Sequence, residues 1–416
     1  MEDIAITGLG VISSIGHSID EFCQNLSTAH VAAGPTPWDN EPSLQNVWMS
    51  KVENFKPEDW MDDRVVDGTD RFAQYAIAAA VQAVDACGMD ELDAERTAVV
   101  IGTSCGGTET IADSQRSLDL EGPTGVDRKL QIKAWTNMAA GQIALRWKLH
   151  GPLLTVTTAC ASSIDAIGTA ARMIERGDCD VAIAGGCEAS RTQVTMIAAG
   201  IYGMLSPQPD PYKACRPFNT ERFGIMGGEG AGVIILERAD LAKARGAKIH
   251  GYLRGYASLS DGFHPSSSNP DGSWEARTME KAIDDAGLPG GTDDVDALIA
   301  HGTGTPLGDI AEIKAINQVF KGRGKSLKVS SIKGHVGHTA GAAGVMGLMA
   351  ALHSMEEGAM VPTAGTTDVD PAAEFDVVIQ KPSEGELKTM QVNGFGFGGQ
   401  NASLVVSRDQ RLTARG

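Results

Sequence analysis

The 416-residue chain contains few aromatic side chains, which make up 5% of its residues. No stretch approaches the roughly 18 to 20 apolar residues that cross a bilayer, so we expect no membrane segment. Its seven cysteines are odd in number and include no CxxC pair. This usage indicates reduced thiols in a cytoplasmic protein rather than a disulfide scaffold. Positive charge is also scarce, and the net charge of −18 argues against nucleic acid or an anionic membrane as the main partner.

Glycine is abundant, with 50 residues, and apolar strands alternate with alanine-rich helical stretches. This alternation is typical of an α/β fold. The predicted strands are Ile4–Thr7, Thr97–Ile101, Leu154–Thr158, Val181–Ala184, Gly232–Leu236, Ala297–Ala300, Lys328–Ser331 and Ala402–Val406. A helix is expected to end near residue 248, where a new strand-like run begins. We therefore predict two halves, residues 1–248 and 249–416.

A weak internal repeat relates these halves. Thr97–Gly107 resembles Ala297–Thr305, and Thr155–Ala170 resembles Val329–Gly344. In the second pair each copy is a short strand, a turn with a reactive residue, and a helix of small residues. If the halves are duplicates whose central helices meet, Cys160 and His338 come together. The alternative is a chance similarity between two strand–turn–helix units.

Cys160 follows a β-branched run and precedes the small-residue pattern of a buried helix. At a helix N-terminus, unpaired N–H groups and the macrodipole favour an anion, which here is a thiolate, the nucleophilic form of cysteine. The alternative is a structural thiol packed under a sheet.

Three further segments carry candidate chemistry. His301 follows a predicted buried strand and precedes a loop of glycines and hydroxyls. Lys333 lies five residues before His338 at a predicted helix start. Residues 393–401 form a glycine-rich turn around Phe397, whose amides suit an anion-binding nest. The structural alternatives are a loop-capping histidine at 301 and a buried phenylalanine at 397.

No metal or nucleotide cofactor is expected. His335 and His338 have an H-x-x-H spacing, but no cysteine or carboxylate cluster accompanies them. The glycines of residues 8–16 lack the spacing of a dinucleotide loop. Residues 324–326 lack the upstream glycine of a phosphate loop.

Taken together, these motifs resemble the β-ketoacyl-acyl-carrier-protein synthase family of the thiolase superfamily. The resemblance covers nearly the whole chain in six ordered motifs. They are the opening Ile4–Ser13, the nucleophile motif Thr158–Ser162, the central signature Arg216–Gly232, the histidine motifs His301–Asp309 and Lys333–Gly344, and the turn Phe395–Asn401. The resemblance implies a thiolase-like fold with duplicated α/β halves in five α-β-α-β-α layers. Two departures are Gly334, where the family usually has serine, and the additional His335, whose role is left open.

The resemblance also implies a two-stage condensation. Cys160 takes an acyl group from acyl-carrier protein, with the amides of Cys160 and Phe397 as oxyanion hole and Phe397 as a gate. Malonyl-carrier then loses CO2, assisted by neutral His301 and His338, and the carbanion attacks the acyl-enzyme. Lys333 holds the histidines, with Asp309 and Glu312 as the carboxylates expected near it.

Other residue roles are implied in the same way. Phosphopantetheine, which arrives on the carrier protein so that no separate cofactor is needed, is expected to bind Thr303, Thr305, His264 and Ser266. An acidic carrier protein requires a local positive patch, for which the candidates are Arg64, Arg71, Arg128 and Lys129. The alternative for these four cations is a solvated surface cluster.

A dimer is expected, with residues 154–158 as a cross-dimer edge and Leu130, Ile132 and Met138 as candidate pocket residues. The partner is a second copy or a chain-length-factor-like subunit. Three alternatives remain open for the activity: housekeeping fatty-acid elongation, a type II polyketide or polyene ketosynthase subunit, and a ketosynthase-like acyltransferase that does not elongate. Both histidines disfavour the last alternative, and Cys160 disfavours an inactive chain-length factor.

Overall fold

The computed structural model describes residues 3–190 and 192–410. Its main sheet has eleven strands in the order β13-β11-β10-β15-β16-β9-β1-β8-β6-β4-β5. The strands of the N-terminal half are β1 (Ile4–Ser13), β4 (Thr97–Gly102), β5 (Leu153–Val156), β6 (Val181–Glu188) and β8 (Gly230–Arg238). Those of the C-terminal half are β9 (Gly251–Ser260), β10 (Ala297–Ile299), β11 (Lys328–Ser330), β13 (Asp376–Val377), β15 (Thr389–Gly396) and β16 (Gln400–Ser407). Each predicted strand therefore overlaps an observed one.

The two halves repeat one topology. In the N-terminal half β4 is parallel to β5 and β6, while β8 is antiparallel to β6 and β1. In the C-terminal half β10 is parallel to β11 and β15, while β16 is antiparallel to β15 and β9. The halves join where β1 pairs with β9, through Ile4–Leu253, Ala5–Tyr252 and Ile6–Gly251. Duplicated halves are thus confirmed, while the boundary at residue 248, just before β9, stays a prediction.

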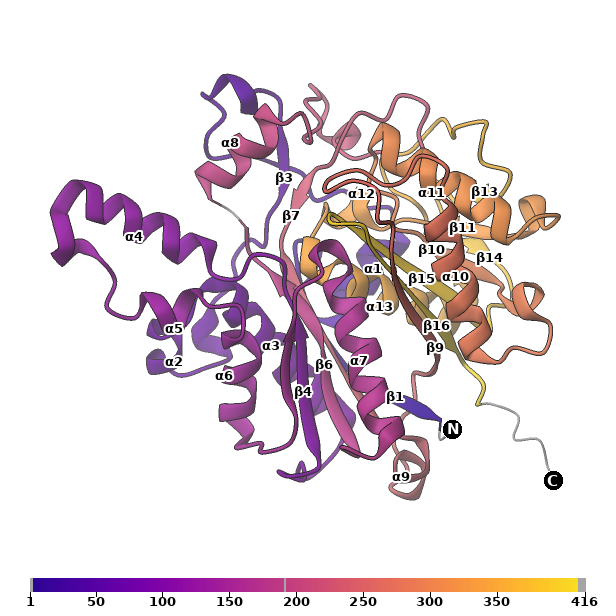
Figure 1. The fold of residues 1–416 in the computed structure, drawn as a ribbon, viewed down its shortest axis with the longest axis horizontal. Coiled ribbons are helices and arrows are strands. Elements are labelled where there is room, and N and C mark those ends of the chain that lie inside the picture. The colour runs from indigo at the N-terminus through magenta and orange to yellow at the C-terminus, as the bar shows by residue number, and fades with distance from the viewer. Residues whose placement is uncertain (1–2, 191, 411–416) are drawn as a thin grey trace.

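Helices complete the five layers (Figure 1). One face of the N-terminal sheet packs on α3 (Arg71–Cys87) and α6 (Met138–Trp147), and the opposite face covers α7 (Ser162–Arg176). The C-terminal sheet packs on α10 (Ser273–Ala286) and α11 (Pro306–Val319), and its inner face covers α13 (Ala343–Glu357). Side chains alternate between the two faces of the sheet along β4, so that Val100 packs in the central core and its neighbour Val99 packs in the outer core.

The central helices approach closely because their facing residues are small. A Cβ on Gly344 would lie 2.3 Å from Cγ1 of Ile164, and one on Gly102 would lie 2.4 Å from the carbonyl carbon of Ser162. Glycine at 344 therefore lets the starts of α7 and α13 meet in the middle of the molecule, and glycine at 102 lets the end of β4 approach the start of α7.

The remaining elements lie around this core. The helices are α1 (Ile19–Ser27), α2 (Asp63–Asp67), α4 (Thr108–Glu121), α5 (Leu130–Ala134), α8 (Gln193–Ile201), α9 (Ala239–Ala244) and α12 (Lys333–Val336). The short strands are β2 (Gly34–Pro35), β3 (Trp48–Ser50), β7 (Gly227–Gly228), β12 (Ala359–Met360) and β14 (Ser383–Glu384). The helix α4 projects away from the body in Figure 1. Within the described residues, no helix is both long and apolar enough to cross a membrane.

Candidate active site

Cys160 lies in a short 3₁₀ turn, Ala159–Ala161, between the end of β5 and the start of α7. The residue before it, Ala159, has φ of 51°, a left-handed conformation that a residue with a Cβ rarely adopts. Hydroxyls hold this turn: Ser162 Oγ accepts from the Thr158 amide at 2.9 Å and donates to the Ala159 carbonyl at 2.6 Å. Ser104 Oγ donates to the same carbonyl at 2.9 Å. The backbone around the thiol is therefore fixed from both sides.

The fold brings His301 and His338 to this thiol. The sulfur of Cys160 and one nitrogen of each histidine all lie within 4.8 Å of one another. The imidazole centroids are 5.4 Å apart and the rings are nearly perpendicular, at 80°. His301 follows β10, and His338 follows α12, so the two halves contribute different members of this trio.

Hydrogen bonds set the histidine tautomers. The Ala340 amide donates to Nδ1 of His338 at 3.2 Å, and Lys333 Nζ lies 3.3 Å from Nδ1 of His301. Because a backbone amide and an ammonium only donate here, both Nδ1 atoms accept, and each neutral ring carries its proton on Nε2. Burial and the Lys333 charge hold the pKa of both histidines well below the usual range. The site thus contains two neutral N–H donors beside one thiol.

These tautomers disfavour a metal ion at the trio. A metal would need an unprotonated Nε2 on His338, and the proton would then have to move to Nδ1, against the Ala340 amide. The cluster has the residue types of a zinc site, but its hydrogen bonds suit donation to an oxygen instead.

Lys333 is buried beside His301 and donates to the His301 carbonyl. Burial lowers the pKa of Lys333, and the nearby Glu312 carboxylate opposes that shift. Glu312 accepts from the amides of His301 and Gly302 at 2.8 and 2.7 Å, and burial raises its pKa to about 7. Asp309 accepts from the amides of Thr303 and Gly304 at 2.9 and 3.0 Å. The two expected carboxylates therefore hold the loop that carries His301.

The surroundings of Cys160 shift the pKa of its thiol in opposite directions. Desolvation by the surrounding protein raises the pKa of Cys160 to about 11, although the charge of Lys333 and the Phe397 amide lower it. Enclosure therefore opposes the thiolate expected at a helix N-terminus, because the desolvation that comes with it outweighs these stabilising contributions.

Phe397 lies in the turn between β15 and β16. Its amide interacts with the thiol of Cys160, and its side chain is 45% exposed. Gly398 and Gly399 have φ of 84° and 74°, and the Gly398 amide donates to the Pro265 carbonyl at 2.7 Å. The alternative of a simply buried phenylalanine is wrong, since the side chain is partly exposed at the surface.

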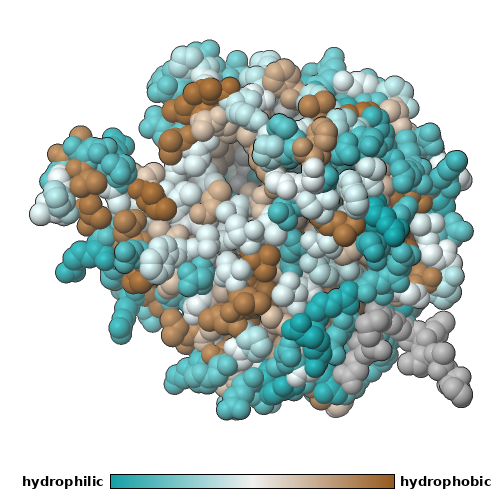
Figure 2. Space-filling model, viewed as in Figure 1, coloured by the Kyte–Doolittle hydropathy of each residue, from teal (hydrophilic) through white to brown (hydrophobic). Residues whose placement is uncertain are grey.

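The predicted phosphopantetheine residues lie in two segments near this turn. The hydroxyls of Thr303 and Thr305 are 2.9 Å apart, and Thr305 caps α11 by accepting from the Gly308 amide. His264 Nδ1 accepts from the Ser266 amide at 3.2 Å, and the Ser266 hydroxyl lies 2.6 Å from that of Tyr202. Figure 2 shows the surface hollowed beside α8, where β7 and α12 lie in Figure 1.

The predicted docking cations belong to a different region, around α2, α3 and α5. Arg71 forms an ion pair with Glu109 at 3.3 Å, and Lys129 forms one with Asp67 at 2.5 Å. Arg64 lies within α2 and Arg128 lies just before α5, both exposed. Carboxylates therefore neutralise two of the four candidates.

His335 is fully buried and lies outside the trio. Its Nε2 donates to the Pro362 carbonyl at 2.8 Å, and its own carbonyl accepts from the Ala32 amide at 3.0 Å. Burial lowers its pKa to about 4. His335 thus anchors α12 to two neighbouring segments.

Sequence reasoning did not identify Glu188, a buried carboxylate at the end of β6. It accepts from the Ser104 amide at 2.9 Å, the Gly341 amide at 3.3 Å and the Ser190 hydroxyl at 2.9 Å. Glu188 thereby ties the segment beside Cys160 to the start of the other central helix. The available signal was its position after a buried strand, at the edge of the sheet where Cys160 also lies.

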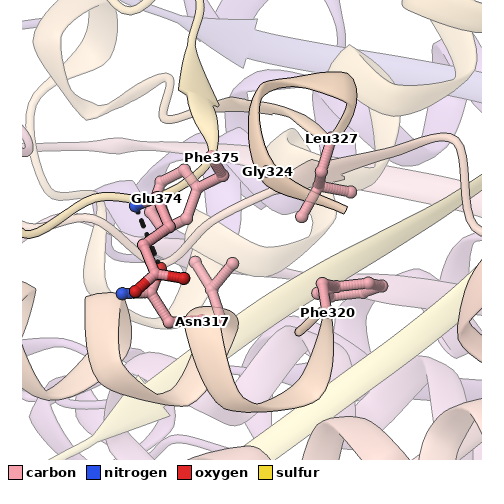
Figure 3. A pocket seen from close by; sticks show the side chains of 7 residues that line it. Asn317, Phe320, Gly324, Leu327, Glu374 and Phe375 are labelled. Carbon is pink, nitrogen blue, oxygen red and sulfur yellow. Dashed lines mark hydrogen bonds between the residues drawn. The ribbon is translucent and has the colours of Figure 1, made fainter. Parts of the chain in front are cut away.

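The hollow in Figure 3 is separate from this site. It is lined by the end of α11 with Gly324, Leu327, Glu374 and Phe375, and Asn317 Oδ1 accepts from the Glu374 amide at 3.1 Å. Its free volume of about 10 Å³ is roughly that needed by one water molecule. None of the predicted catalytic residues lines it.

Comparison with known proteins agrees with this geometry. Residues 1–242 match the β-ketoacyl synthase N-terminal domain, and residues 250–367 match the C-terminal domain. The chain is 36% identical over 408 residues to 3-oxoacyl-[acyl-carrier-protein] synthase 2 of Staphylococcus aureus, covering 97% of this chain and 98% of the relative. It is 34% identical over 410 residues to the Vibrio cholerae protein of the same name, covering 97% and 99%.

Solved structures agree as well. The ishigamide ketosynthase/chain length factor superposes with a TM-score of 0.91 at 33% identity, over 98% of this chain and 100% of that one. A β-ketoacyl synthase from Burkholderia phymatum gives 0.91 at 30% identity, over 99% and 100%. With its thiol, two imidazole donors and duplicated sheets, the chain belongs to the β-ketoacyl synthase family of acyltransferases, and its activity is the condensation that extends an acyl group carried on an acyl-carrier protein.

Proposed function

We propose that Cys160 is the acylated nucleophile and that His301 and His338 drive decarboxylation. In the first stage the Cys160 sulfur attacks the carrier thioester, and the thiol proton leaves with the carrier's phosphopantetheine thiol. The amides of Cys160 and Phe397 stabilise the oxyanion, and removing one such donor typically lowers the rate by about 10²–10³. The Phe397 amide already lies against the sulfur, which supports this assignment.

In the second stage a malonyl-carrier thioester loses CO2. The Nε2–H groups of His301 and His338 donate to the enolate oxygen as its charge develops. The enolate carbon then attacks the acyl-enzyme, forming the new carbon–carbon bond, and the Cys160 sulfur leaves and regains a proton. The observation that carries this proposal is that Nδ1 of each histidine accepts a hydrogen bond. Each Nε2 therefore carries the proton and can donate a hydrogen bond beside the thiol.

We propose positioning roles for the neighbouring residues. Lys333 keeps the histidines neutral and fixes His301, and Glu312 and Asp309 hold the His301 loop. Thr303, Thr305, His264 and Ser266 bind the phosphopantetheine arm, which the carrier protein supplies, so that the enzyme needs no cofactor of its own. Arg64, Arg71, Arg128 and Lys129 form the proposed cationic docking region.

We also propose a dimer formed along β5 and a cytoplasmic location. β5 is the last strand of the sheet, and Leu153 and Leu154 on it are 48% and 43% exposed. An unpaired apolar edge strand is a ready surface for pairing with a second sheet. Its partner is a second copy or a chain-length-factor-like subunit. All seven cysteines are free thiols, which fits a reducing compartment.

The test is intact-mass analysis of the protein with acyl-carrier and malonyl-carrier. An acyl adduct on Cys160 and a product two carbons longer are expected, and the range of accepted acyl groups separates fatty-acid from polyketide substrates. His301→Ala and His338→Ala should still form the acyl-enzyme but lose decarboxylation. Loss of acylation in both variants would contradict the assignment of acylation to Cys160 and of decarboxylation to the two histidines. Because Cys105 is also exposed, the adduct must be located on the peptide.

The matched control is a variant that lacks the thiol of Cys160. Cys160→Ala should form no adduct, while malonyl-carrier decarboxylation, which needs only the histidines, should persist. Acylation without elongation in the unmodified protein would favour the non-elongating acyltransferase, or a missing partner subunit if adding that subunit restores elongation.

A further inference from the structure

Glu188, the last residue of β6, is a buried carboxyl group whose two oxygens each accept from two donors. Oε2 accepts from the amides of Ser104 and Gly341, at 2.9 and 3.3 Å. Oε1 accepts from the Ser190 hydroxyl at 2.9 Å and from the Cys105 amide at 3.4 Å. Backbone amides can only donate, so this arrangement has no acceptor among them for a carboxylic acid proton. The donors therefore favour the ionised form of Glu188, although burial raises its pKa.

Through Ser104, Glu188 reaches the turn that carries Cys160. Ser104 Oγ donates to the Ala159 carbonyl at 2.9 Å, and its amide donates to Glu188. Ala159 has φ of 51°, a conformation that persists only where the surroundings over-determine it. One residue thus joins Glu188 to the backbone immediately before the thiol.

Through Gly341, Glu188 reaches His338. The amide of Ala340, the residue before Gly341, donates to Nδ1 of His338 at 3.2 Å. That bond decides which ring nitrogen carries the proton. The turn is packed directly on β6, since a Cβ on Gly186 would lie 2.5 Å from the Gly341 carbonyl oxygen. Glu188 therefore holds the peptide group next to the one on which the His338 tautomer depends.

Glu188 also acts on the thiol through its charge. Desolvation raises the pKa of Cys160, the charge of Lys333 lowers it, and the charge of Glu188 raises it again. Lys333 lies beside His301 in the C-terminal half, whereas Glu188 belongs to the N-terminal sheet. Each half thus contributes one charge to the environment of the nucleophile, and the two charges oppose each other.

We propose that Glu188 is a positioning residue with two effects: its hydrogen bonds hold the Cys160 turn and the His338 ring in register, and its negative charge opposes ionisation of the unacylated thiol. This inference rests on the proposed roles of Cys160 and His338 in condensation. The thiolate is the form that oxidants and alkylating agents attack, so a charge that opposes it protects the nucleophile between turnovers.

Two substitutions at position 188 separate the charge from the hydrogen bonds. Glu188→Gln keeps an oxygen for the amides of Ser104 and Gly341 and can donate from its NH2 group to the Ser190 hydroxyl, so it removes mainly the charge. Glu188→Ala removes both the charge and the bonds. Iodoacetamide labelling of the Cys160 peptide between pH 7 and 10 measures the first effect. Glu188→Gln should label about threefold faster than the unmodified protein at each pH, because less negative charge faces the thiol.

Decarboxylation of malonyl-carrier, supplied as the only substrate, measures the second effect. Glu188→Ala should lower kcat by about tenfold or more, because a misplacement of about 1 Å can cost about a hundredfold. Glu188→Gln should restore kcat to within about threefold of the unmodified protein, since the amide oxygen still accepts both bonds.

Glu237→Gln is the matched control. Glu237 is also a buried carboxylate, but it lies opposite Val181, the first residue of β6, and pairs with Arg245. This substitution should change neither labelling of Cys160 nor decarboxylation, and urea unfolding of each variant reports whether the fold is kept.

Two results would overturn the proposal: labelling of Glu188→Gln at the unmodified rate, or normal decarboxylation by Glu188→Ala. If Glu188→Ala does not fold, Glu188→Asp replaces it, because aspartate keeps the charge but has a shorter reach. It should label as the unmodified protein does and lose decarboxylation, and normal decarboxylation would again overturn the positioning role. If instead the unmodified protein neither acylates Cys160 nor decarboxylates malonyl-carrier, the proposed function itself fails.

Discussion

The turn that carries Cys160 and its counterpart in the C-terminal half have nearly the same backbone. Thr158-Ala159-Cys160-Ala161 matches Thr339-Ala340-Gly341-Ala342 in sequence. Ala159 and Ala340 both have positive φ, at 51° and 42°, and both turns close with a 3.0 Å bond from the fourth residue's amide to the first residue's carbonyl. Each turn then enters a central helix, α7 or α13.

This comparison corrects one prediction. The sequence repeat equated Cys160 with His338, but the matching turns equate Cys160 with Gly341. His338 belongs instead to the connection before the turn, which runs from residue 331 to 339 in the C-terminal half and covers only residues 157–158 in the N-terminal half. The longer connection holds α12, and with it Lys333 and His338. Thus one copy supplies the nucleophile within a short turn, and the other supplies the groups that act on it from an added helical turn.

The largest expected effect comes from making the two turns alike. Cys160→Gly gives the N-terminal turn the residue found at 341, so the fold should persist while condensation falls by about a thousandfold or more, since no acyl-enzyme can form. Circular dichroism and carrier-dependent elongation measure the two properties. An unfolded variant would contradict the equivalence, and elongation near the normal rate would contradict the role of Cys160.

The reverse change, a side chain at 341, should affect stability instead. A Cβ on Gly341 would lie 2.7 Å from the Thr103 Cα and 2.8 Å from the Ser104 amide nitrogen, both backbone atoms. Gly341→Ala should therefore lower the free energy of unfolding by about 3 kcal/mol, the upper end of typical overpacking effects.

Gly141→Ala is the matched control for that substitution. Gly141 lies within α6, and a Cβ there meets nothing within 4 Å. Alanine should raise stability by about 0.5–1 kcal/mol through helix propensity. Equal effects of the two substitutions in denaturant unfolding would mean that the turn at 341 tolerates a side chain.

The predictable and unpredictable parts of this site differ in physical origin. Strands, halves and the convergence of Cys160, His301 and His338 follow from patterns in the chain, because parallel strands end at one sheet edge. The tautomers depend on a single amide, that of Ala340, and on where Lys333 Nζ lies, which no residue pattern specifies. The thiol pKa depends on enclosure by both halves, and the sequence showed only the helix start.

The two turns also differ electrostatically, because only the N-terminal turn carries a thiol, and the pH dependence of Cys160 labelling measures the shift in its pKa. Because the pKa of Cys160 is raised to about 11, its thiolate fraction should rise about tenfold per pH unit between pH 7 and 10. Iodoacetamide labelling of the Cys160 peptide should follow that slope. Lys333→Met should slow labelling further, since the Lys333 charge lowers the thiol pKa. A labelling rate that levels off below pH 8 would show a resting thiolate.

The last expected effect concerns how α12 is held, the element that the N-terminal half lacks. The pKa of buried His335 is lowered to about 4 from 6.5. Between these pKa values His335 is protonated in the unfolded chain but stays neutral in the folded protein. The free energy of unfolding therefore falls as the pH falls. His335→Gln keeps an N–H for the Pro362 carbonyl but cannot titrate, so between pH 7 and 5 it should lose about 2 kcal/mol less stability than the unmodified protein. His301 and His338 titrate in both proteins and cancel in the comparison. If urea unfolding shows the same acid sensitivity in both proteins, His335 is not held neutral, and the anchoring of α12 must come from its backbone carbonyl and the Ala32 amide instead.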